Sequence, residues 1–409
     1  MAAAGLLGKE EAAEPAASPQ SGHQAPAGIQ PGAYMPELES LRGLAILLVV
    51  SYHMGLLEIG TTIDPASIPY PLSFVRAGHT GVSLFFVLSA FLLSQPFIAE
   101  ARGGRRVVRR RYCARRVLRI LPLYYTAVVL VAVYEANHVR DLLNGIPYLF
   151  FLNPVPPTLG QFSRPWWSLA PEAQFYLVLP LVPFLVRSRV GIMVGIGFVV
   201  VYGLWLFGYP QLGHTLQELS AYRTWLSHSL LGQGPVFLCG VLAAWLYQRH
   251  GPAIRAALEA NPLARFGGAD LVFVAVLAAL CVLLHAVTIV GPVRLDFSPL
   301  QVWHALEGAL WAMVVLLILL APLRTKPILA NGGLERLGTV SYSLYLVHGP
   351  VIVLTSAAIR THFPQLIRPW NATTLAIAVG IGLTSVAVAS VTYWIIERPF
   401  LTRKVKIRG

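Results

Sequence analysis

The chain has 409 residues, of which 56% are hydrophobic and only 12% are charged. A soluble domain usually carries about 25% charged residues, so the composition excludes an ordinary soluble protein and predicts an all-α bundle of membrane-spanning helices. The formal net charge of +13 does not point to nucleic-acid binding, because the basic residues lie between the apolar segments, where they indicate topology.

The N-terminal residues 1–33 are dominated by Ala, Pro, Gly, Ser and Gln and show no apolar period. This composition predicts a disordered cytoplasmic tail, and the tail lacks the apolar core of a signal peptide. Residues 34–402 are predicted to form one transmembrane domain, and 403–409 a basic cytoplasmic tail. Roughly ten segments of this domain approach the length that spans hydrocarbon: Leu41–Leu57, Val82–Phe97, Leu118–Tyr134, Leu169–Leu185, Val190–Phe207, Leu226–Tyr247, Leu271–Val290, Val302–Leu323, Val340–Ile359 and Leu375–Ile396.

The basic residues predict the orientation of these spans. Alternating crossings from a cytoplasmic N-terminus place 23 Lys and Arg residues inside and 7 outside, with Arg42 left within the first span. This bias follows the positive-inside rule and predicts that both termini are cytoplasmic. The chain is rich in Ala, Gly and Arg and poor in Lys, which indicates a bacterial gene of high GC content. We therefore expect a multi-pass protein of the bacterial cytoplasmic membrane, with the lipid bilayer as a partner and without nucleic acid.

The first span carries two ionisable residues, Arg42 and His53, and such residues are costly inside a membrane and usually functional. Their spacing of eleven residues is three helical turns plus about 20°, so both lie on one face, about 16 Å apart along the axis. An imidazole can accept or donate a proton near neutral pH. The alternative interpretation is a snorkelling arginine and an interfacial histidine at the two ends of one span.

The segment 105–119 contains eight arginines and no lysine, although lysine would serve topology equally well. Arginine forms planar, bidentate contacts with phosphate. Arg116 and Arg119 are neighbours on the helix that enters the third span, because residues three apart share a helix face. The alternative is a topology determinant that touches anionic lipid headgroups, which explains less well why two cations continue into the span.

Two later segments place polar residues in or beside spans. On the outer side, Trp167 and Tyr176 flank Glu172, which lies within the first turns of the fourth span. Tryptophans at an interface are ordinary anchors, whereas Glu172 must face protein or water. In the ninth span, one helix face is shared by three residues: Ser341, Tyr345 and His348. We interpret these three first as interhelical hydrogen-bonding groups, with chemistry as the alternative.

Six segments resemble, in the same order, motifs of the acyltransferase family 3 membrane enzymes: Leu38–His53, Gly81–Phe91, Arg115–Tyr125, Trp167–Tyr176, Ser341–His348 and Glu397–Phe400. The similarity covers about residues 35 to 402, and Glu39 stands where the family commonly has Asp. Spans five to eight carry no motif that matches. The resemblance implies transfer of an acyl group, acetyl or propionyl, from an acyl-coenzyme A to a hydroxyl of a sugar or a secondary metabolite such as a macrolide. Of the possible acceptors we favour a small secondary metabolite or its sugar over a glycan.

The resemblance also implies roles for individual residues. His53 is the expected general base, and Glu172 is expected to orient its imidazole in the manner of a triad. Arg42, Arg116 and Arg119 are expected to bind the acyl-coenzyme A. Substrate binding or structural support is expected from a further group: Trp167, Tyr176, Ser341, Tyr345 and His348. A metal is not expected, because the thiolate of coenzyme A leaves readily without one.

Two mechanisms and one rival class follow from the same residues. In direct transfer, His53 deprotonates the acceptor hydroxyl as it attacks; in the covalent route, His53 itself carries the acyl group. We favour direct transfer. A proton-coupled secondary transporter of an organic anion or drug would also place His, Arg and Glu within the membrane, and it is the alternative to an enzyme.

Overall fold

The protein is described from a computed structural model. The structure describes residues 35–57, 73–152, 157–208, 216–290, 302–366 and 372–406. They all belong to the second of two compact units, 34–409. The tail predicted for residues 1–33 lies outside the described residues.

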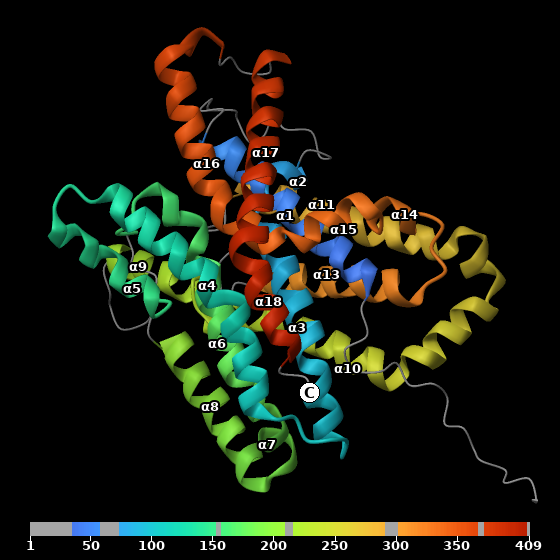
Figure 1. The fold of residues 1–409 in the computed structure, drawn as a ribbon. Helices are drawn as coiled ribbons and strands as arrows, with labels where there is room; N and C mark the ends of the chain where they lie inside the picture. The colour runs from blue at the N-terminus through green and yellow to red at the C-terminus, as the bar shows by residue number, and fades with distance from the viewer. Residues whose placement is uncertain are drawn as a thin grey trace, which may run out of the picture. The chain divides into compact units, whose positions relative to one another are not determined.

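Helices form the described part of the chain, which contains no strand, and this confirms the predicted all-α class (Figure 1). The long helices are α1 (Pro36–Leu57), α3 (Thr80–Ala101), α4 (Arg109–Glu135), α8 (Arg189–Gly208), α10 (Leu230–Ala260), α11 (Ala269–Val290), α13 (Val302–Leu320), α16 (Ser341–His362) and α17 (Ala372–Thr392). The shorter helices are α2 (Ser73–Arg76), α5 (Ile146–Leu149), α6 (Leu169–Val178), α7 (Val182–Arg187), α9 (Leu216–Ser227), α14 (Lys326–Leu329), α15 (Gly332–Thr339) and α18 (Arg398–Lys406). Single 3-10 or π-helical turns connect several of them: η3 (Val139–Gly145), η4 (Gln161–Ser168), η5 (Leu179–Leu181), η7 (Ala264–Gly268), η8 (Pro364–Leu366) and η9 (Tyr393–Glu397).

Eight helical stretches of the described residues are long and apolar enough to cross a membrane: Thr80–Ala101, Arg109–Glu135, Gln161–Arg187, Thr224–Ala260, Ala264–Thr288, Trp303–Leu320, Ser341–His362 and Ala372–Thr402. A shorter apolar helix covers Arg189–Leu204, and α1 holds the predicted first span. The predicted apolar segments therefore fall on helices. The number of crossings and the cytoplasmic position of the termini stay predictions.

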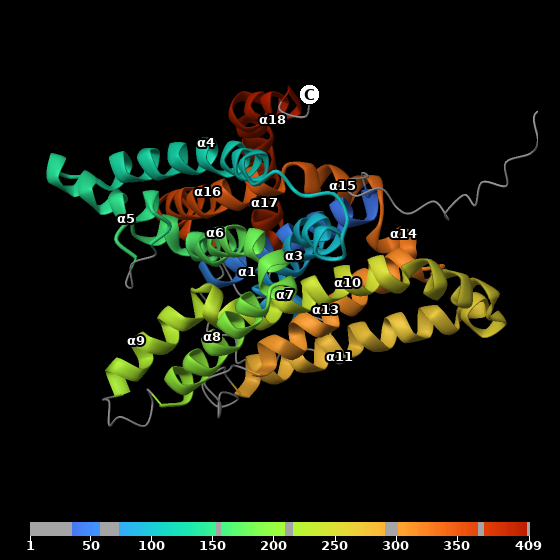
Figure 2. The same cartoon turned by 90° about the horizontal axis from the view of Figure 1, so that it is seen from below.

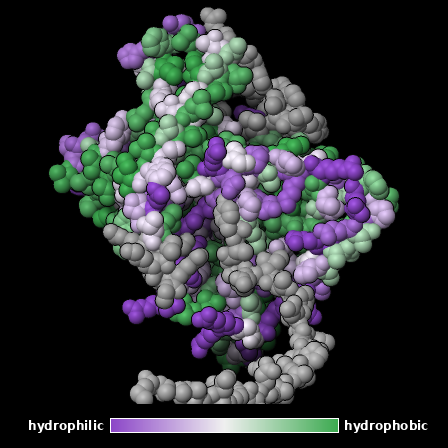
Figure 3. All heavy atoms as spheres, turned by 45° about the vertical axis from the view of Figure 1, so that its right-hand side comes forward, coloured by the Kyte–Doolittle hydropathy of each residue, from purple (hydrophilic) through white to green (hydrophobic). Residues whose placement is uncertain are grey.

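The surface of these helices suits a lipid environment. Large hydrophobic side chains are exposed along α8, α11 and α17, among them Val199, Leu271 and Leu383. Figure 3 shows broad hydrophobic areas, in green, on the face that it draws. Broad exposed apolar areas are unusual on a soluble monomer, and helices that are apolar on all sides are typical of membrane spans.

Helix α1 lies inside the bundle of this unit and packs against α3, α15 and α16, as Figures 1 and 2 show from two directions. Glycines allow the closest of these contacts. A Cβ atom on Gly43 would clash with the carbonyl of Leu334, and one on Gly338 would clash with the carbonyl of Glu39. Small residues allow such close approach of helix backbones in membranes, and here they fix α1 against the segment that leads into α16.

The start of α1 is held by an ion pair outside its apolar stretch. Lys326 Nζ donates to Glu37 Oε1 over 2.8 Å. Partial burial raises the pKa of Glu37, but the hydrogen bond and the charge of Lys326 outweigh burial and hold this pKa below its usual value. A lowered carboxyl pKa contributes stability above the unfolded-state pKa and loses it as pH falls through the folded-state pKa, so this pair weakens only in acid.

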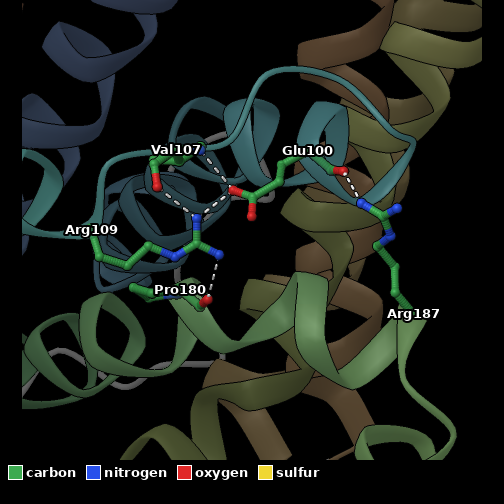
Figure 4. A network of polar contacts seen from close by, with 5 residues as sticks. All are labelled: Glu100, Val107, Arg109, Pro180 and Arg187. Atoms are coloured by element: carbon green, nitrogen blue, oxygen red, sulfur yellow. Dashed lines mark hydrogen bonds and ion pairs between the residues drawn. The ribbon is translucent and has the colours of Figure 1, made fainter.

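A polar network fixes the arginine-rich segment against α7 (Figure 4). Glu100 Oε2 accepts hydrogen bonds from the Val107 backbone N–H, over 2.8 Å, and from Arg109 Nη1. The other end of the Arg109 guanidinium donates to the carbonyl of Pro180 over 3.2 Å. Arg187 Nη1 donates to the Glu100 carbonyl over 3.1 Å. The end of α3 and the start of α4 are thereby tied to the η5–α7 segment.

We expect Arg109→Ala to lower the stability of the detergent-solubilised protein by about 1–3 kcal/mol, because it leaves the Glu100 carboxylate without its charged partner. The Glu100 side chain is only 9% exposed, so water replaces the lost contact poorly. The midpoint of thermal unfolding measures the effect. Arg110→Ala is the matched control, since Arg110 is exposed; equal midpoints for both variants would contradict the structural role of Arg109.

Candidate active site

Arg42 and His53 both face α16, which confirms that they share one face of α1. Arg42 Nη2 donates to Ser341 Oγ over 3.1 Å, and its Nη1 lies 3.5 Å from Glu39 Oε2. Eleven residues further along α1, His53 lies beside His348 of α16, with Nδ1 of His53 and Nε2 of His348 3.3 Å apart. The contact between α1 and α16 therefore holds two polar pairs. Near the start of α1, Arg42 pairs with the Ser341 hydroxyl, and three turns further on the imidazoles of His53 and His348 lie side by side.

The hydrogen bonds of the two imidazoles assign their tautomers. Nδ1 of His53 is 2.8 Å from the Val49 carbonyl, and Nδ1 of His348 is 3.1 Å from the Leu344 carbonyl. A carbonyl only accepts hydrogen bonds, so both Nδ1 atoms carry the hydrogen. Nε2 of His348 is then the acceptor that faces His53. Nε2 of His53 keeps its lone pair and has no hydrogen-bond partner among the described residues.

Burial differs between these two histidines in a way that separates their roles. His348 is fully buried, at 0% exposure, whereas His53 is half-buried. Their ring centroids are 5.0 Å apart. A half-buried imidazole with a free nitrogen is the one of the pair that can meet a substrate.

Tyr345 ties α16 to the segment that precedes α6. Its hydroxyl donates to the Pro165 carbonyl and lies 2.6 Å from Ser168 Oγ. Its ring lies 5.8 Å from that of His348. Trp167, the residue before Ser168, stacks on His228 at a centroid distance of 4.8 Å. Tyr345 thus lies beside the histidine pair, whereas the ring of Trp167 packs on His228.

The three predicted phosphate-binding arginines, Arg42, Arg116 and Arg119, come from α1 and α4 and form one arginine cluster. Arg119 lies close enough to Arg42 and to Arg116 for their positive charges to repel. Arg116 lies 5.8 Å from the centre of the Tyr176 ring, and its buried Nε has no hydrogen-bond partner among the described residues. A bare guanidinium N–H next to another cation is a site where an anion would be bound.

Glu172 belongs to this arginine cluster. Its Oε1 accepts hydrogen bonds from Ser89 Oγ, over 2.9 Å, and from the Tyr176 hydroxyl. Its charge acts on all three arginines. Among the described residues it makes no hydrogen bond or ion pair with His53. The side chain that faces Nδ1 of His53 is instead His348, and Glu172 lies with the cations.

One carboxylate of the cluster carries no role in the sequence-based prediction. Glu397, in η9, is 3% exposed, accepts a hydrogen bond from Ser343 Oγ over 2.7 Å, and interacts with the charges of Arg42 and Arg119. A carboxylate close to the end of an apolar span is costly, and this was the signal that could have identified it.

The described residues contain no group of three or more His, Cys, Asp or Glu side chains that could hold a metal ion. The polar groups around α1 thus divide into an imidazole pair, His53 and His348, and an arginine cluster with its carboxylates.

Several known proteins are similar to this chain. A family model described as an acyltransferase domain matches residues 35–394. A peptidoglycan O-acetyltransferase, OatA, of Listeria monocytogenes is 23% identical over 363 residues, which are 82% of this chain and 52% of the relative. A putative peptidoglycan O-acetyltransferase, YrhL, of Bacillus subtilis is 25% identical over 397 residues, 90% of this chain and 55% of the relative.

A putative acetyltransferase, ORF330, of Acidianus two-tailed virus is 34% identical over 184 residues, 43% of this chain and 50% of the relative. The chain thus spans about half the length of the curated relatives that it matches. No solved structure matches it.

Proposed function

The chain belongs to the acyltransferase domain family. We propose that it is a membrane-bound O-acyltransferase, which transfers the acyl group of an acyl-coenzyme A to a hydroxyl of a saccharide acceptor. The observation that carries this proposal is the half-buried His53, whose Nε2 is free, on the same face of α1 as Arg42, the member of the arginine cluster that α1 contributes. We place the protein in the cytoplasmic membrane of a bacterium, in keeping with its bacterial relatives.

Acyl-coenzyme A, with an acetyl or propionyl group, is the proposed acyl donor. Its phosphates require cations, and guanidinium groups bind them by two parallel hydrogen bonds. The arginine cluster offers three such groups, and the unpartnered Nε of Arg116 is free to donate. When no acyl donor is bound, the positive charges of the arginines are balanced by three carboxylates: Glu172, Glu397 and Glu39. The pantetheine arm would then run along α1 from Arg42 toward His53.

The proposed reaction uses His53 as a general base. Nε2 of His53 takes the proton of the acceptor hydroxyl, and the hydroxyl oxygen attacks the thioester carbonyl carbon. The carbon–sulfur bond breaks, and the coenzyme A thiolate takes the proton back from the imidazolium. The products are an ester and free coenzyme A thiol. In the covalent alternative, Nε2 attacks the thioester itself, and ping-pong kinetics with a trapped acyl-enzyme would establish that route instead.

His348 is proposed as the residue that positions His53. Its Nε2 accepts from the Nδ1–H of His53, which holds the imidazole with Nε2 toward the substrate. We expect His348→Phe, which keeps a ring but removes the acceptor, to lower kcat by about 10- to 100-fold, the scale of a lost orienting hydrogen bond. The KM for the acyl donor should change little.

His348→Gln separates positioning from packing. A glutamine carbonyl can accept a hydrogen bond near the place of Nε2, so this variant should recover part of the kcat lost in His348→Phe. Equal kcat values for the two variants would show that the acceptor atom of His348 is not needed.

The acceptor is proposed to be a saccharide, and a cell-wall glycan is the first choice, because the two bacterial relatives reported above bear the name of peptidoglycan O-acetyltransferases. A macrolide, whose sugars also carry hydroxyls, is the second. Both offer secondary or primary alcohols that need a base to become nucleophilic.

Purified protein in detergent tests this proposal. Acetyl- and propionyl-coenzyme A are incubated with peptidoglycan fragments or with a macrolide, and free thiol and acylated product are measured by a thiol reagent and mass spectrometry. Thiol release that depends on the acceptor supports the enzyme. Uptake of the acceptor into proteoliposomes without thioester cleavage would overturn it in favour of a transporter.

A further inference from the structure

A second polar cluster lies between α3 and α13, which pack against each other and appear side by side in Figures 1 and 2. Its centre is Glu307, which is 0% exposed. One carboxylate oxygen, Oε2, accepts from Ser83 Oγ over 2.9 Å and lies 3.4 Å from Nδ1 of His304. None of these residues takes part in the reaction described above. An ionisable residue buried this deeply in a membrane protein is costly and usually has a function.

Two atoms of this cluster lack a partner. Oε1 of Glu307 and Nε1 of Trp303 are both buried, and neither has a hydrogen-bond partner among the described residues. The two residues are four apart on α13 and so lie on one helix face, about 6 Å apart along its axis. The neighbouring indole, Trp311, is satisfied, because its Nε1 donates to Thr80 Oγ1 over 2.7 Å. Thr80 also interacts with the Glu307 carboxylate, so in this cluster the unpartnered atoms are one oxygen of Glu307 and the indole nitrogen of Trp303.

The unpaired atoms are complementary in kind. Glu307 Oε1 can only accept a hydrogen bond, and Trp303 Nε1 can only donate one. A hydroxyl group accepts one hydrogen bond and donates another, so a single hydroxyl between them would satisfy both. An ammonium group would leave the indole N–H unpaired, and a phosphate would be repelled by the carboxylate.

A continuous row of rings joins this turn to the candidate active site. We call it the ring row: His348, His53, Tyr52, His79, Trp303 and His304. Successive ring centroids along it are 5.0, 5.2, 5.6, 6.0 and 3.5 Å apart. Its members come from α16, α1, the start of α3 and α13, so it crosses the bundle. His53, Tyr52 and His79 are half-buried, so the row is not sealed within the core over its middle part.

We propose that Glu307 and Trp303 form a subsite for a second hydroxyl of the acceptor, with the ring row between this subsite and His53. The inference rests on the proposed transfer to a saccharide and adds to it the requirement for an acceptor with more than one hydroxyl. Sugars offer both several hydroxyls and apolar ring faces, and binding sites for small molecules commonly combine aromatic walls with a few convergent polar groups. The subsite binds the part of the acceptor that does not react.

Equilibrium binding to the full chain in detergent, without acyl-coenzyme A, tests the subsite. The probes are the N-acetylglucosaminyl-N-acetylmuramyl disaccharide-peptide of peptidoglycan and erythromycin. We expect at least one probe to bind the wild-type protein. Glu307→Gln replaces one carboxylate oxygen by an amide donor and removes the negative charge. It should weaken binding of that probe by about 10- to 100-fold, as expected for a lost hydrogen bond to a charged group. Trp303→Phe, which keeps a ring and removes the indole N–H, should weaken it by a smaller factor.

Matched controls are Glu135→Gln and Trp245→Phe, since both residues are exposed and lie outside the two clusters; neither should change the affinity. The affinity for acetyl-coenzyme A should stay the same in all four variants. If Glu307→Gln fails to fold, Trp303→Phe decides.

The deciding variant is Glu307→Gln or, where that variant fails to fold, Trp303→Phe. If it binds every probe that the wild-type protein binds, and with wild-type affinity, then only a resident water occupies the turn and the subsite is overturned. Failure of both probes to bind the wild-type protein would overturn it too. Thiol release by the wild-type protein, measured separately with acetyl-coenzyme A, reports on the proposed transfer itself, so the two failures are distinguishable.

Discussion

His53→Ala is expected to reduce acyl transfer by about 10²- to 10⁴-fold, the contribution of a positioned general base. The reason is geometric: Nε2 of His53 is the free nitrogen of the His53–His348 pair, and His348 directs its own Nε2 at His53 instead of at a substrate. Without His53, an acceptor alcohol keeps its proton and remains a weak nucleophile. Acceptor-dependent thiol release at saturating substrate measures the loss.

Two observations separate this loss from a folding defect. The affinity for acetyl-coenzyme A should stay within a few-fold of the wild-type value, since the arginine cluster lies at the other end of the α1 face. His250→Ala is the matched control, because His250 is exposed on α10 and should keep wild-type activity. A His53→Ala protein that is folded, binds the acyl donor and transfers at the wild-type rate would refute the role of His53.

Arg116→Ala and Arg119→Ala are expected to weaken binding of acyl-coenzyme A by about 10- to 100-fold each, the value of a charge-assisted hydrogen bond to phosphate. Arg116 is half-buried and presents an unpartnered Nε, so its removal deletes a donor that the protein itself does not use. Arg116→Lys keeps the charge without the planar fork and should restore only part of the affinity. Isothermal titration with acetyl-coenzyme A measures both effects.

The exposed Arg110 supplies the control for this series, because Arg110→Ala removes one charge of the same segment without touching the arginine cluster. Binding should also weaken with rising salt, since charge attraction at a partly open site is screened. Thermal unfolding of each variant checks that removing an arginine has not destabilised the nearby carboxylates. Equal affinities of Arg116→Ala, Arg119→Ala and Arg110→Ala for the acyl donor would exclude the cluster as its binding site.

The sequence by itself determined the features that depend on neighbours along the chain. Runs of apolar residues predicted the helices, because a segment in hydrocarbon must satisfy its backbone internally. The spacing of Arg42 and His53 predicted their common face, because helical periodicity is a local property. The order of short motifs indicated the family over nearly the whole chain, and the match over residues 35–394 confirmed it.

The tertiary structure decided what lies opposite each of these residues. His348, interpreted from sequence as hydrogen-bonding glue, is the partner of His53, and Glu172, expected beside His53, lies with the arginines. The surroundings of Glu397 depend on the packing of α4 against η9, and those of Glu307 depend on the packing of α3 against α13. Such contacts depend on the depth and rotation at which two helices meet, and at the contact of α1 with α15 the glycines Gly43 and Gly338 allow a close approach of the backbones. Spacing along one helix contains no information about the register between helices, which is why the ionisable groups could be recognised individually but not paired.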